Sequence, residues 1–235
     1  MADFKLELIE IITHCCDVKT FRFELTEDVA FKPGQYLALT LDINRQKVTK
    51  AFSMSNAPTE KGYVEFTKKL SESDFSKALN RLEIGRTYSI RMPMGNFTFE
   101  GECPKAAFLS GGIGITPVRS IFKYVTDKKL SSSLVLLHSS RSEEYLIFKH
   151  DFALMQKENR NLKIVYTLTH CAQALPGCRA GRIDEAMIKE EIPDYRERKF
   201  FLCGPPQMVE GMFGLVHKDL SVSEADIITE NFIGY

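Results

Sequence analysis

A glycine-rich stretch constrains the fold of this chain more than any other feature: it reads Leu109-Ser110-Gly111-Gly112-Ile113-Gly114-Ile115-Thr116-Pro117. An apolar run leads into it and Val118-Arg119-Ser120-Ile121-Phe122 leads out, which predicts a strand, a tight turn and a helix. Thr116 suits the N-cap and Pro117 the first helical position. Glycines let a backbone approach a pyrophosphate, and a helix N-terminus offers it free N–H groups. The stretch therefore predicts either a dinucleotide cradle at Gly111, Gly112, Gly114 and Thr116 or a turn that binds nothing.

The residues after Gly101 alternate between apolar strands and longer helical patterns, which indicates a parallel sheet with helices on both faces. The expected strands are 106–110, 133–138, 163–168, 200–203 and 226–229. The expected helices are 117–127, 149–159, 184–189 and 206–217.

The first hundred residues instead read as short strands with turn signals between them. We expect these strands at 4–12, 19–24, 36–42, 47–53, 63–69 and 87–92, with one helix at 74–82. Such spacing is typical of an antiparallel barrel or a sandwich, and alternation alone does not separate the two. The pattern changes near Phe99–Pro104, which predicts domains at 1–101 and 102–235.

The charge balance and the cysteine spacing exclude several classes of protein. The chain has 31 basic and 31 acidic residues and no long run of like charge, so neither nucleic acid nor an anionic membrane is expected as a partner. No apolar stretch is long enough to span a membrane and the N-terminus does not begin a signal peptide, so we expect a cytoplasmic protein. The six cysteines form no C-x₂-C pair and the five histidines no i, i+4 pair, so no metal site is predicted.

Two further segments accompany the glycine turn, namely Lys50-Ala51-Phe52-Ser53 before it and Phe201-Leu202-Cys203-Gly204-Pro205-Pro206 after it. In this order the three motifs resemble the ferredoxin–NADP reductase superfamily, and most of all its stand-alone flavin reductases and oxygenase reductase components. The resemblance implies a flavin-binding β-barrel over 1–101 and an NAD(P)-binding α/β domain over 102–235. It also implies FAD as the cofactor, with FMN as the alternative, and NAD(P)H as co-substrate.

The resemblance assigns roles in the barrel. Lys50 replaces the family's usual arginine and would contact the flavin phosphate, Phe52 would pack on the isoalloxazine ring, and Ser53 would hydrogen-bond near N5. Lysine is a point charge without arginine's planar fork, so the substitution bears on how tightly flavin is held. The strand with Thr67 and Lys68 would line the edge of the ring, and Ser76 would hold the phosphate. From the residues alone, a half-buried strand with Phe52 in the core remains the alternative.

The resemblance also assigns roles in the nucleotide half. A Rossmann fingerprint expects an acid after the second strand, but this chain has His138-Ser139-Ser140-Arg141 there. Ser139 and Arg141, assisted by Arg182, would hold a ribose or a 2′-phosphate. Cys203 and Gly204 would lie beside the nicotinamide, with Cys203 as a structural cysteine in the alternative. The C-terminal aromatics Phe232 and Tyr235 are candidates for covering the flavin, although Phe232 also suits a core position.

The sequence therefore predicts an NAD(P)H-dependent flavoprotein oxidoreductase. Hydride would pass from nicotinamide to flavin, and electrons would leave to free flavin, a ferredoxin-like protein or an oxygenase component. Ser53 and Cys203 are the residues expected beside the reacting atoms. Two alternatives remain: the electron-transfer subunit of a dihydroorotate dehydrogenase, whose terminal cysteine cluster this chain lacks, and a flavin- or nucleotide-binding module without turnover.

Overall fold

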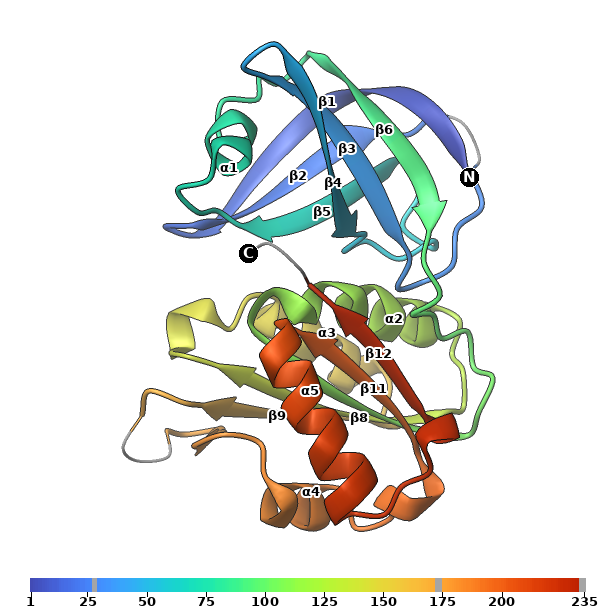
Figure 1. Cartoon of the computed structure of the whole chain (residues 1–235). Coiled ribbons are helices and arrows are strands. Elements are labelled where there is room, and N and C mark those ends of the chain that lie inside the picture. The colour runs from blue at the N-terminus through green and yellow to red at the C-terminus, as the bar shows by residue number, and fades with distance from the viewer. Residues whose placement is uncertain (27–28, 172–174, 233–235) are drawn as a thin grey trace.

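The computed structural model describes residues 1–26, 29–171 and 175–232, which build two six-stranded sheets, one from each half of the chain (Figure 1). The first sheet is antiparallel, with the strand order β4-β3-β6-β1-β2-β5. Its strands are β1 (Ala2–Cys15), β2 (Val18–Glu24), β3 (Tyr36–Ile43), β4 (Gln46–Ser53), β5 (Tyr63–Lys69) and β6 (Thr87–Met94). The sheet curls until β5 returns to the end of β4, where Met54 and Phe66 form one isolated bridge. The predicted barrel is thus confirmed, with its closure limited to that bridge.

Aromatic side chains fill the barrel because alternate residues of its strands face inward. Phe52 stacks on Phe66 with the ring centroids 4.4 Å apart, and Phe21 stacks on the same residue at 5.4 Å. Helix α1 (Asp74–Leu79) packs beside this core and begins at Ser73, whose side chain caps it by accepting a hydrogen bond from the Ser76 amide. The helix is shorter than the sequence predicts, since the chain turns at Asn80.

The second sheet is parallel throughout, with the strand order β10-β9-β8-β7-β11-β12. Its strands are β7 (Lys105–Gly111), β8 (Ser133–Ser140), β9 (Leu162–Leu168), β10 (Cys178–Ala180), β11 (Lys199–Gly204) and β12 (Ile227–Asn231). Its helices are α2 (Ile115–Asp127), α3 (Lys149–Glu158), α4 (Glu185–Glu191) and α5 (Pro206–Gly214).

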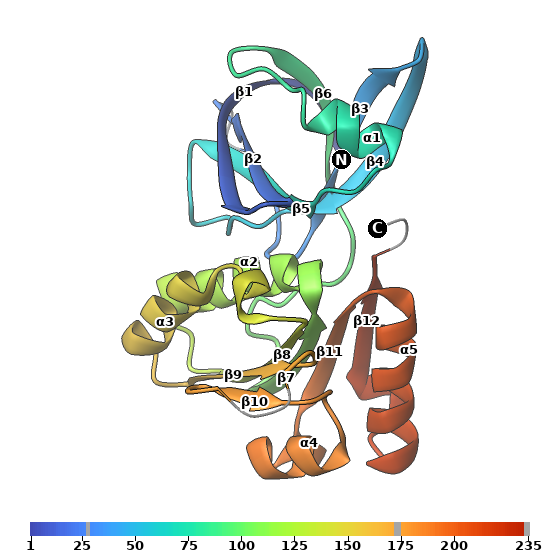
Figure 2. The same ribbon diagram turned by 90° about the vertical axis from the view of Figure 1, so that its left-hand side faces the viewer.

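Helices cover both faces of this sheet, as predicted (Figure 2). On β7, Ala106 and Phe108 pack into the core formed with α2 and α3. The alternate residues Ala107 and Leu109 pack into the core formed with α4 and α5. Because both faces are buried, the strand reads as a continuous apolar run rather than an alternating one.

The structure corrects the predicted start of the helix after the glycine turn. Gly112–Gly114 form a 3₁₀ turn that runs directly into α2, whose N-cap is Gly114. Thr116 is therefore not the N-cap, because it already lies within the first turn and its hydroxyl donates to the Ile113 carbonyl at 3.1 Å. The helix begins at Ile115, two residues before Pro117.

Two other elements differ from the sequence prediction. The three-residue edge strand β10 was not expected, and the last long helix changes at Leu215 into a π-helical turn over Leu215–Asp219. Within the described ranges, no helix combines the length and the apolar character that crossing a membrane requires.

Candidate functional site

A pocket of about 320 Å³ lies at the end of β4, where the barrel faces the last strand of the parallel sheet. We call it the β4 pocket; its lining residues are Tyr36, Lys50, Ala51, Phe52, Ser53, Lys68, Ser73, Phe75, Glu230, Asn231 and Phe232. It gathers five of the residues predicted to bind flavin: Lys50, Phe52, Ser53, Lys68 and Phe232. The pocket therefore joins the barrel motif to the C-terminal strand, which lies far away in the sequence.

One charged side chain of the β4 pocket, Lys68, is buried, and a second, Glu230, is half-buried. Lys68 is 4% exposed, and burial, helped by the positive charge of Lys50, lowers its pKa to about 8. Its ammonium nitrogen lies 5.9 Å from the centroid of the Phe52 ring. Across the pocket, burial raises the pKa of Glu230. Burial costs free energy because it disfavours the charged forms of both the lysine and the carboxylate. A pocket that nevertheless contains both groups is typical of a functional site.

Phe52 lies in the barrel core, as one interpretation of the sequence had it, and its packing on a flavin ring stays a prediction. Its side chain is 4% exposed and stacks on Phe66, so it belongs to the barrel core. It also lines the β4 pocket, where it provides an apolar wall beside the Ser53 hydroxyl. The barrel core thus continues directly into the pocket and fixes the orientation of that wall.

A second pocket, of about 430 Å³, lies over the glycine turn. We call it the turn pocket; its lining residues are Val18, Lys69, Leu70, Ser71, Gly112, Ile113, Ser140, Arg141, Tyr145, Ile147, Pro205, Pro206 and Phe232. It lies at the carboxyl ends of the parallel strands, where open α/β sheets bind ligands. Phe232, 8% exposed, lines both pockets, so the two pockets meet at this residue.

The three glycines of the turn are needed for different reasons. Gly112 has φ +53°, and a Cβ there would meet nothing within 4 Å, so its backbone is open towards the turn pocket. At Gly114 a Cβ would lie 2.4 Å from the Cys203 carbonyl oxygen, because helix α2 packs against strand β11 at this point. At Gly111 a Cβ would overlap the Met208 side chain. Gly112 therefore suits a ligand contact, while Gly114 permits helix–strand packing.

Cys203 lies below the turn rather than in either pocket. Its side chain is fully buried, and its thiol donates a hydrogen bond to the Gly114 carbonyl at 3.0 Å. Burial, with a smaller contribution from Glu230, raises the pKa of this thiol, which keeps it protonated. Its predicted contact with nicotinamide stays a prediction, and the visible role of the thiol is to hold the turn.

Several predicted residues do not line either pocket. Thr67 faces inward, where its hydroxyl donates to Ser55 and shares a hydrogen bond with Thr20. Ser76 is 1% exposed, and it is Ser73, its capping partner, that reaches the β4 pocket.

The other predicted residues outside the pocket linings belong to the second half of the chain: Gly111, Gly114, Thr116, Ser139, Arg182, Cys203 and Gly204. Arg179, which lies on β10 three residues before Arg182 and was a further candidate to assist it, pairs with Glu190 and Glu191 instead. Tyr235 lies outside the described residues.

Sequence reasoning missed some residues that line the pockets: Tyr36, Ser73, Phe75, Glu230, Ser140 and Tyr145. A usable signal existed for Glu230, because it stands two residues before Phe232 and alternate residues of an extended chain point the same way. For Ser140 the signal was its place beside Arg141 at the end of β8. The sequence held no such signal for Tyr145, because its neighbour in space is Lys69, which is distant in the sequence. The Lys69 ammonium lies 4.0 Å from the centroid of the Tyr145 ring.

The two pockets fit the groups that the motifs imply. The β4 pocket offers an aromatic wall, a small hydroxyl and the cations Lys50 and Lys68, which suit a flat apolar ring with an anionic tail. The turn pocket offers a positive-φ glycine with open space above it and the cation Arg141, which suit a nucleotide with a pyrophosphate. Buried, perturbed charges such as that of Lys68 cluster at functional sites.

Comparison with known families and structures agrees with this geometry. Residues 5–99 match the family described as oxidoreductase FAD-binding domain, and residues 108–213 match the oxidoreductase NAD-binding domain. The FAD/NAD-binding domain of a nitric oxide dioxygenase from Vibrio cholerae has the same fold, with a TM-score of 0.85 at 20% identity over 97% of this chain and 98% of that one. A ferredoxin NADP+ reductase from Neisseria gonorrhoeae, bound to FAD and NADP, superposes with a TM-score of 0.84 at 22% identity, covering 97% of this chain and 98% of that one.

Curated relatives include a glycine betaine monooxygenase reductase subunit from Pseudomonas aeruginosa. It is 30% identical over 84% of this chain and 56% of that subunit. They also include an NADH-cytochrome b5 reductase 1 from Mortierella alpina, 26% identical over 96% of this chain and 78% of that protein. The chain thus spans just over half the length of the monooxygenase reductase subunits that it matches. With an FAD-binding domain followed by an NAD-binding domain, the chain belongs to the ferredoxin–NADP reductase superfamily of oxidoreductases.

Proposed function

We propose that this protein is an NAD(P)H-dependent flavoprotein reductase that takes hydride from a nicotinamide nucleotide and passes electrons to a separate acceptor. The observation that carries the proposal is a shared residue: Phe232 lines both the β4 pocket and the turn pocket. Two ligands bound on either side of one side chain are close enough to react when that side chain moves. Positioning of this kind, together with exclusion of water, is what hydride transfer needs from a protein.

In this proposal the residues of the β4 pocket hold FAD. Lys50 binds the phosphate, Phe52 supports the ring, Ser53 donates to its polar edge and Lys68 supplies a positive charge beside it. Bound FAD supplies a ring that accepts two electrons and releases them singly or in pairs. The proposed domain boundary lies between 101 and 102, in the segment between β6 and β7 where Gly101 adopts φ +101°.

The turn pocket holds the nucleotide. The open backbone at Gly112 receives the pyrophosphate, and Arg141 with Ser140 receives the ribose or its 2′-phosphate. The acidic residue that would bind the ribose in a Rossmann fingerprint is missing after β8. Its absence there supports acceptance of NADPH as well as NADH. Cys203 and Gly204 set the strand end against which the nicotinamide rests, without donating or accepting a proton.

The acceptor is proposed by class: free flavin, a ferredoxin-like protein or an oxygenase component. Support for a protein acceptor comes from the relatives whose names describe reductase subunits of a monooxygenase and reductases of cytochrome b5. These names describe those proteins, and the acceptor of this chain is open to direct assay.

The purified protein should oxidise NADH or NADPH when an acceptor is supplied. We expect saturable turnover with ferricyanide or free FAD, because both pockets are formed in the protein. The measurement follows the loss of nucleotide absorbance in parallel assays with FAD, FMN and ferricyanide. Absence of oxidation with every pair of nucleotide and acceptor would contradict the proposal and favour a binding module.

Lys50→Ala should weaken FAD binding by ~1–3 kcal/mol, the range for a charge-assisted hydrogen bond. Lys50→Arg should hold or tighten binding, since the guanidinium adds a planar fork of donors. Equilibrium titration with FAD measures both effects. Lys47→Ala is the matched control, because Lys47 is an exposed lysine of the same strand that does not line the pocket. Equal affinity in Lys50→Ala and Lys47→Ala would refute the role of Lys50.

A further inference from the structure

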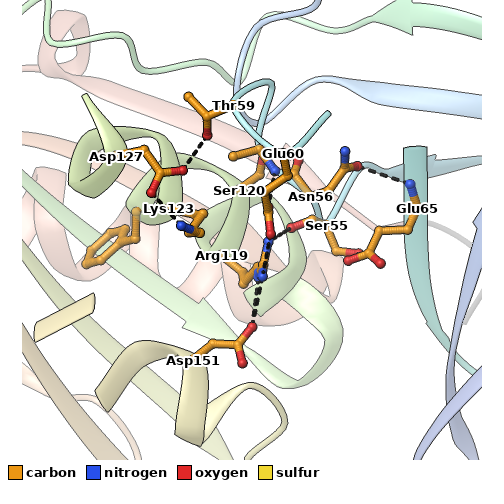
Figure 3. A network of polar contacts seen from close by, with 12 residues as sticks. Ser55, Asn56, Thr59, Glu60, Glu65, Arg119, Ser120, Lys123, Asp127 and Asp151 are labelled. Carbon is orange, nitrogen blue, oxygen red and sulfur yellow. Dashed lines mark hydrogen bonds and ion pairs between the residues drawn. The ribbon is translucent and has the colours of Figure 1, made fainter. Parts of the chain in front are cut away.

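We propose that Arg119 is a positioning residue that sets the distance between the β4 pocket and the turn pocket. It lies on helix α2, which begins at the glycine turn, and it reaches across to the barrel segment that follows β4 (Figure 3). The inference rests on the proposed function, because it concerns how two bound cofactors are aligned. Neither pocket contains Arg119, so the residue acts only through the backbone it holds.

The guanidinium group of Arg119 is fully engaged by both halves of the molecule. Its two terminal nitrogens bind the two carboxylate oxygens of Glu60, and one of them also donates to the Ser55 carbonyl at 3.2 Å. Its Nε donates to Asp151 on helix α3 at 3.0 Å. A planar, bidentate arrangement of this kind fixes direction as well as distance. The residue therefore joins α2, α3 and the barrel at one point.

The next residue of the helix grips the same segment. Ser120 donates to the Asn56 carbonyl at 2.7 Å and lies 3.4 Å from the Gly34 amide, which donates to it. Two consecutive residues of α2 thus hold two consecutive carbonyls of the barrel. This double attachment restrains rotation of the segment as well as its separation from the helix.

The gripped segment follows directly after β4, whose residues Lys50, Phe52 and Ser53 line the β4 pocket. Ser55 comes two residues after Ser53, and its amide donates to the Glu65 carbonyl at 2.9 Å. The side chain of Asn56 accepts from the Glu65 amide and donates to the Tyr63 carbonyl, both at 3.0 Å. Glu65 lies on β5, the strand that carries Lys68. A displacement at Ser55 therefore moves both strands that line the pocket.

At its N-terminal end, helix α2 is continuous with the 3₁₀ turn that contains Gly112, about two helical turns away from Arg119. The helix is rigid over this length, so the position of Arg119 also sets the position of the turn pocket. The hydrogen bonds of the Arg119 side chain to the barrel thus fix the position of the turn pocket relative to the β4 pocket.

Electrostatics explain why the attachment is an arginine. Arg119 is 8% exposed. Burial alone would lower its pKa, but hydrogen bonds to Glu60 and the charges of Glu60 and Asp151 raise it, so the group stays charged. Burial raises the pKa of nearby Glu65, against the charges of Arg119 and Arg22. A lysine at this position would keep the positive charge but lose the planar guanidinium with its paired N–H donors. The Arg119→Lys variant therefore separates the contribution of the charge from that of the directed hydrogen bonds.

The test compares Arg119→Lys with Asp127→Asn in the FAD-loaded protein. Asp127 of α2 accepts a hydrogen bond from the Thr59 hydroxyl of the barrel at 2.5 Å, in an exposed position. It is the matched control, because this contact joins the same two halves of the molecule without a bidentate guanidinium. Affinities for FAD and for the nucleotide, flavin reduction at saturating nucleotide, and amide hydrogen exchange of residues 55–65 in the flavin-free protein are measured for each. If Arg119→Lys does not fold, Glu60→Gln removes the same pairing from the other side.

We expect Arg119→Lys to keep both affinities, to speed exchange at 55–65, and to slow flavin reduction by about tenfold to a hundredfold, as small misplacements of reacting groups do. Asp127→Asn should match the original protein throughout. Flavin reduction at the original rate, or a loss of FAD affinity that accounts for the slower reduction, would overturn the positioning role. An original protein that binds both cofactors and does not reduce flavin would instead refute the proposed function.

Discussion

Adding one methyl group at Gly114 should unfold much of the protein, whereas the same change at Gly112 should leave it folded with a weaker affinity for the nucleotide. At Gly114 the new Cβ would lie 2.4 Å from the Cys203 carbonyl oxygen and 2.8 Å from the Gly204 Cα. These are backbone atoms of a central strand that have no room to shift, so Gly114→Ala should lower the free energy of unfolding by about 3 kcal/mol or more. The strand–helix contact is the reason this position is a glycine.

Gly112→Ala meets no neighbour, since nothing lies within 4 Å of the added Cβ. Its cost is the left-handed backbone, at φ +53°, which disfavours a non-glycine residue by ~1–2 kcal/mol. The methyl group would occupy the turn pocket and raise the KM for NAD(P)H, while FAD content stays the same. Urea unfolding and nucleotide titration measure the two effects. If the two variants lost equal stability and bound the nucleotide alike, the glycine turn would be only a turn.

Lys68→Met should stabilise the flavin-free protein while slowing flavin reduction. The folded-state pKa of Lys68 is about 8, compared with 10.5 for an ordinary lysine. Below pH 8 the side chain is charged in both the folded and the unfolded state, so the folded state bears the whole cost of burying that charge. The cost is lost as the pH rises from about 8 to 10.5. After allowance for solvent at the pocket mouth, methionine should raise the free energy of unfolding near pH 7 by ~1–2 kcal/mol.

The same substitution should slow flavin reduction by about tenfold to a hundredfold, because a hydride adds negative charge where Lys68 supplies positive charge. Urea unfolding of the flavin-free protein at neutral and alkaline pH, and flavin reduction by NAD(P)H, measure the two effects. Lys47→Met is the control for the loss of a lysine from the barrel surface. A stability difference that does not shrink with rising pH, or an unchanged reduction rate, would contradict this assignment.

The sequence predicted most strands of both sheets because their patterns are local. Apolar runs such as Ala106–Ser110 and alternation such as that of Lys19–Glu24 identify strands without reference to the rest of the chain. The edge strand β10 escaped because only Cys178 of its three residues is buried. The start of α2 was misplaced because Thr116 and Pro117 carry good capping signals, while the 3₁₀ turn before them depends on packing of Gly114 against Cys203.

The motifs located the two pockets but not all the side chains that line them. Lys50, Phe52 and Ser53 line the β4 pocket together, and their contacts with flavin stay a prediction. Ser76 and Cys203 turned inward, because one is covered by its own capping partner and the other packs under the turn. The contacts of Arg119 lay beyond sequence reasoning, since Ser55 and Glu60 are far from it along the chain and the helix itself reads as apolar and amphipathic.

The central claim is that one chain brings a nicotinamide nucleotide and FAD together on either side of Phe232. It is tested most directly by mixing the FAD-loaded protein with NADH or NADPH in the absence of oxygen and of any acceptor, and following the visible absorbance of the oxidised flavin. The account predicts loss of that absorbance in a single exponential phase whose rate saturates with nucleotide. Flavin that stays oxidised with both nucleotides, yet is reduced by dithionite, would contradict it.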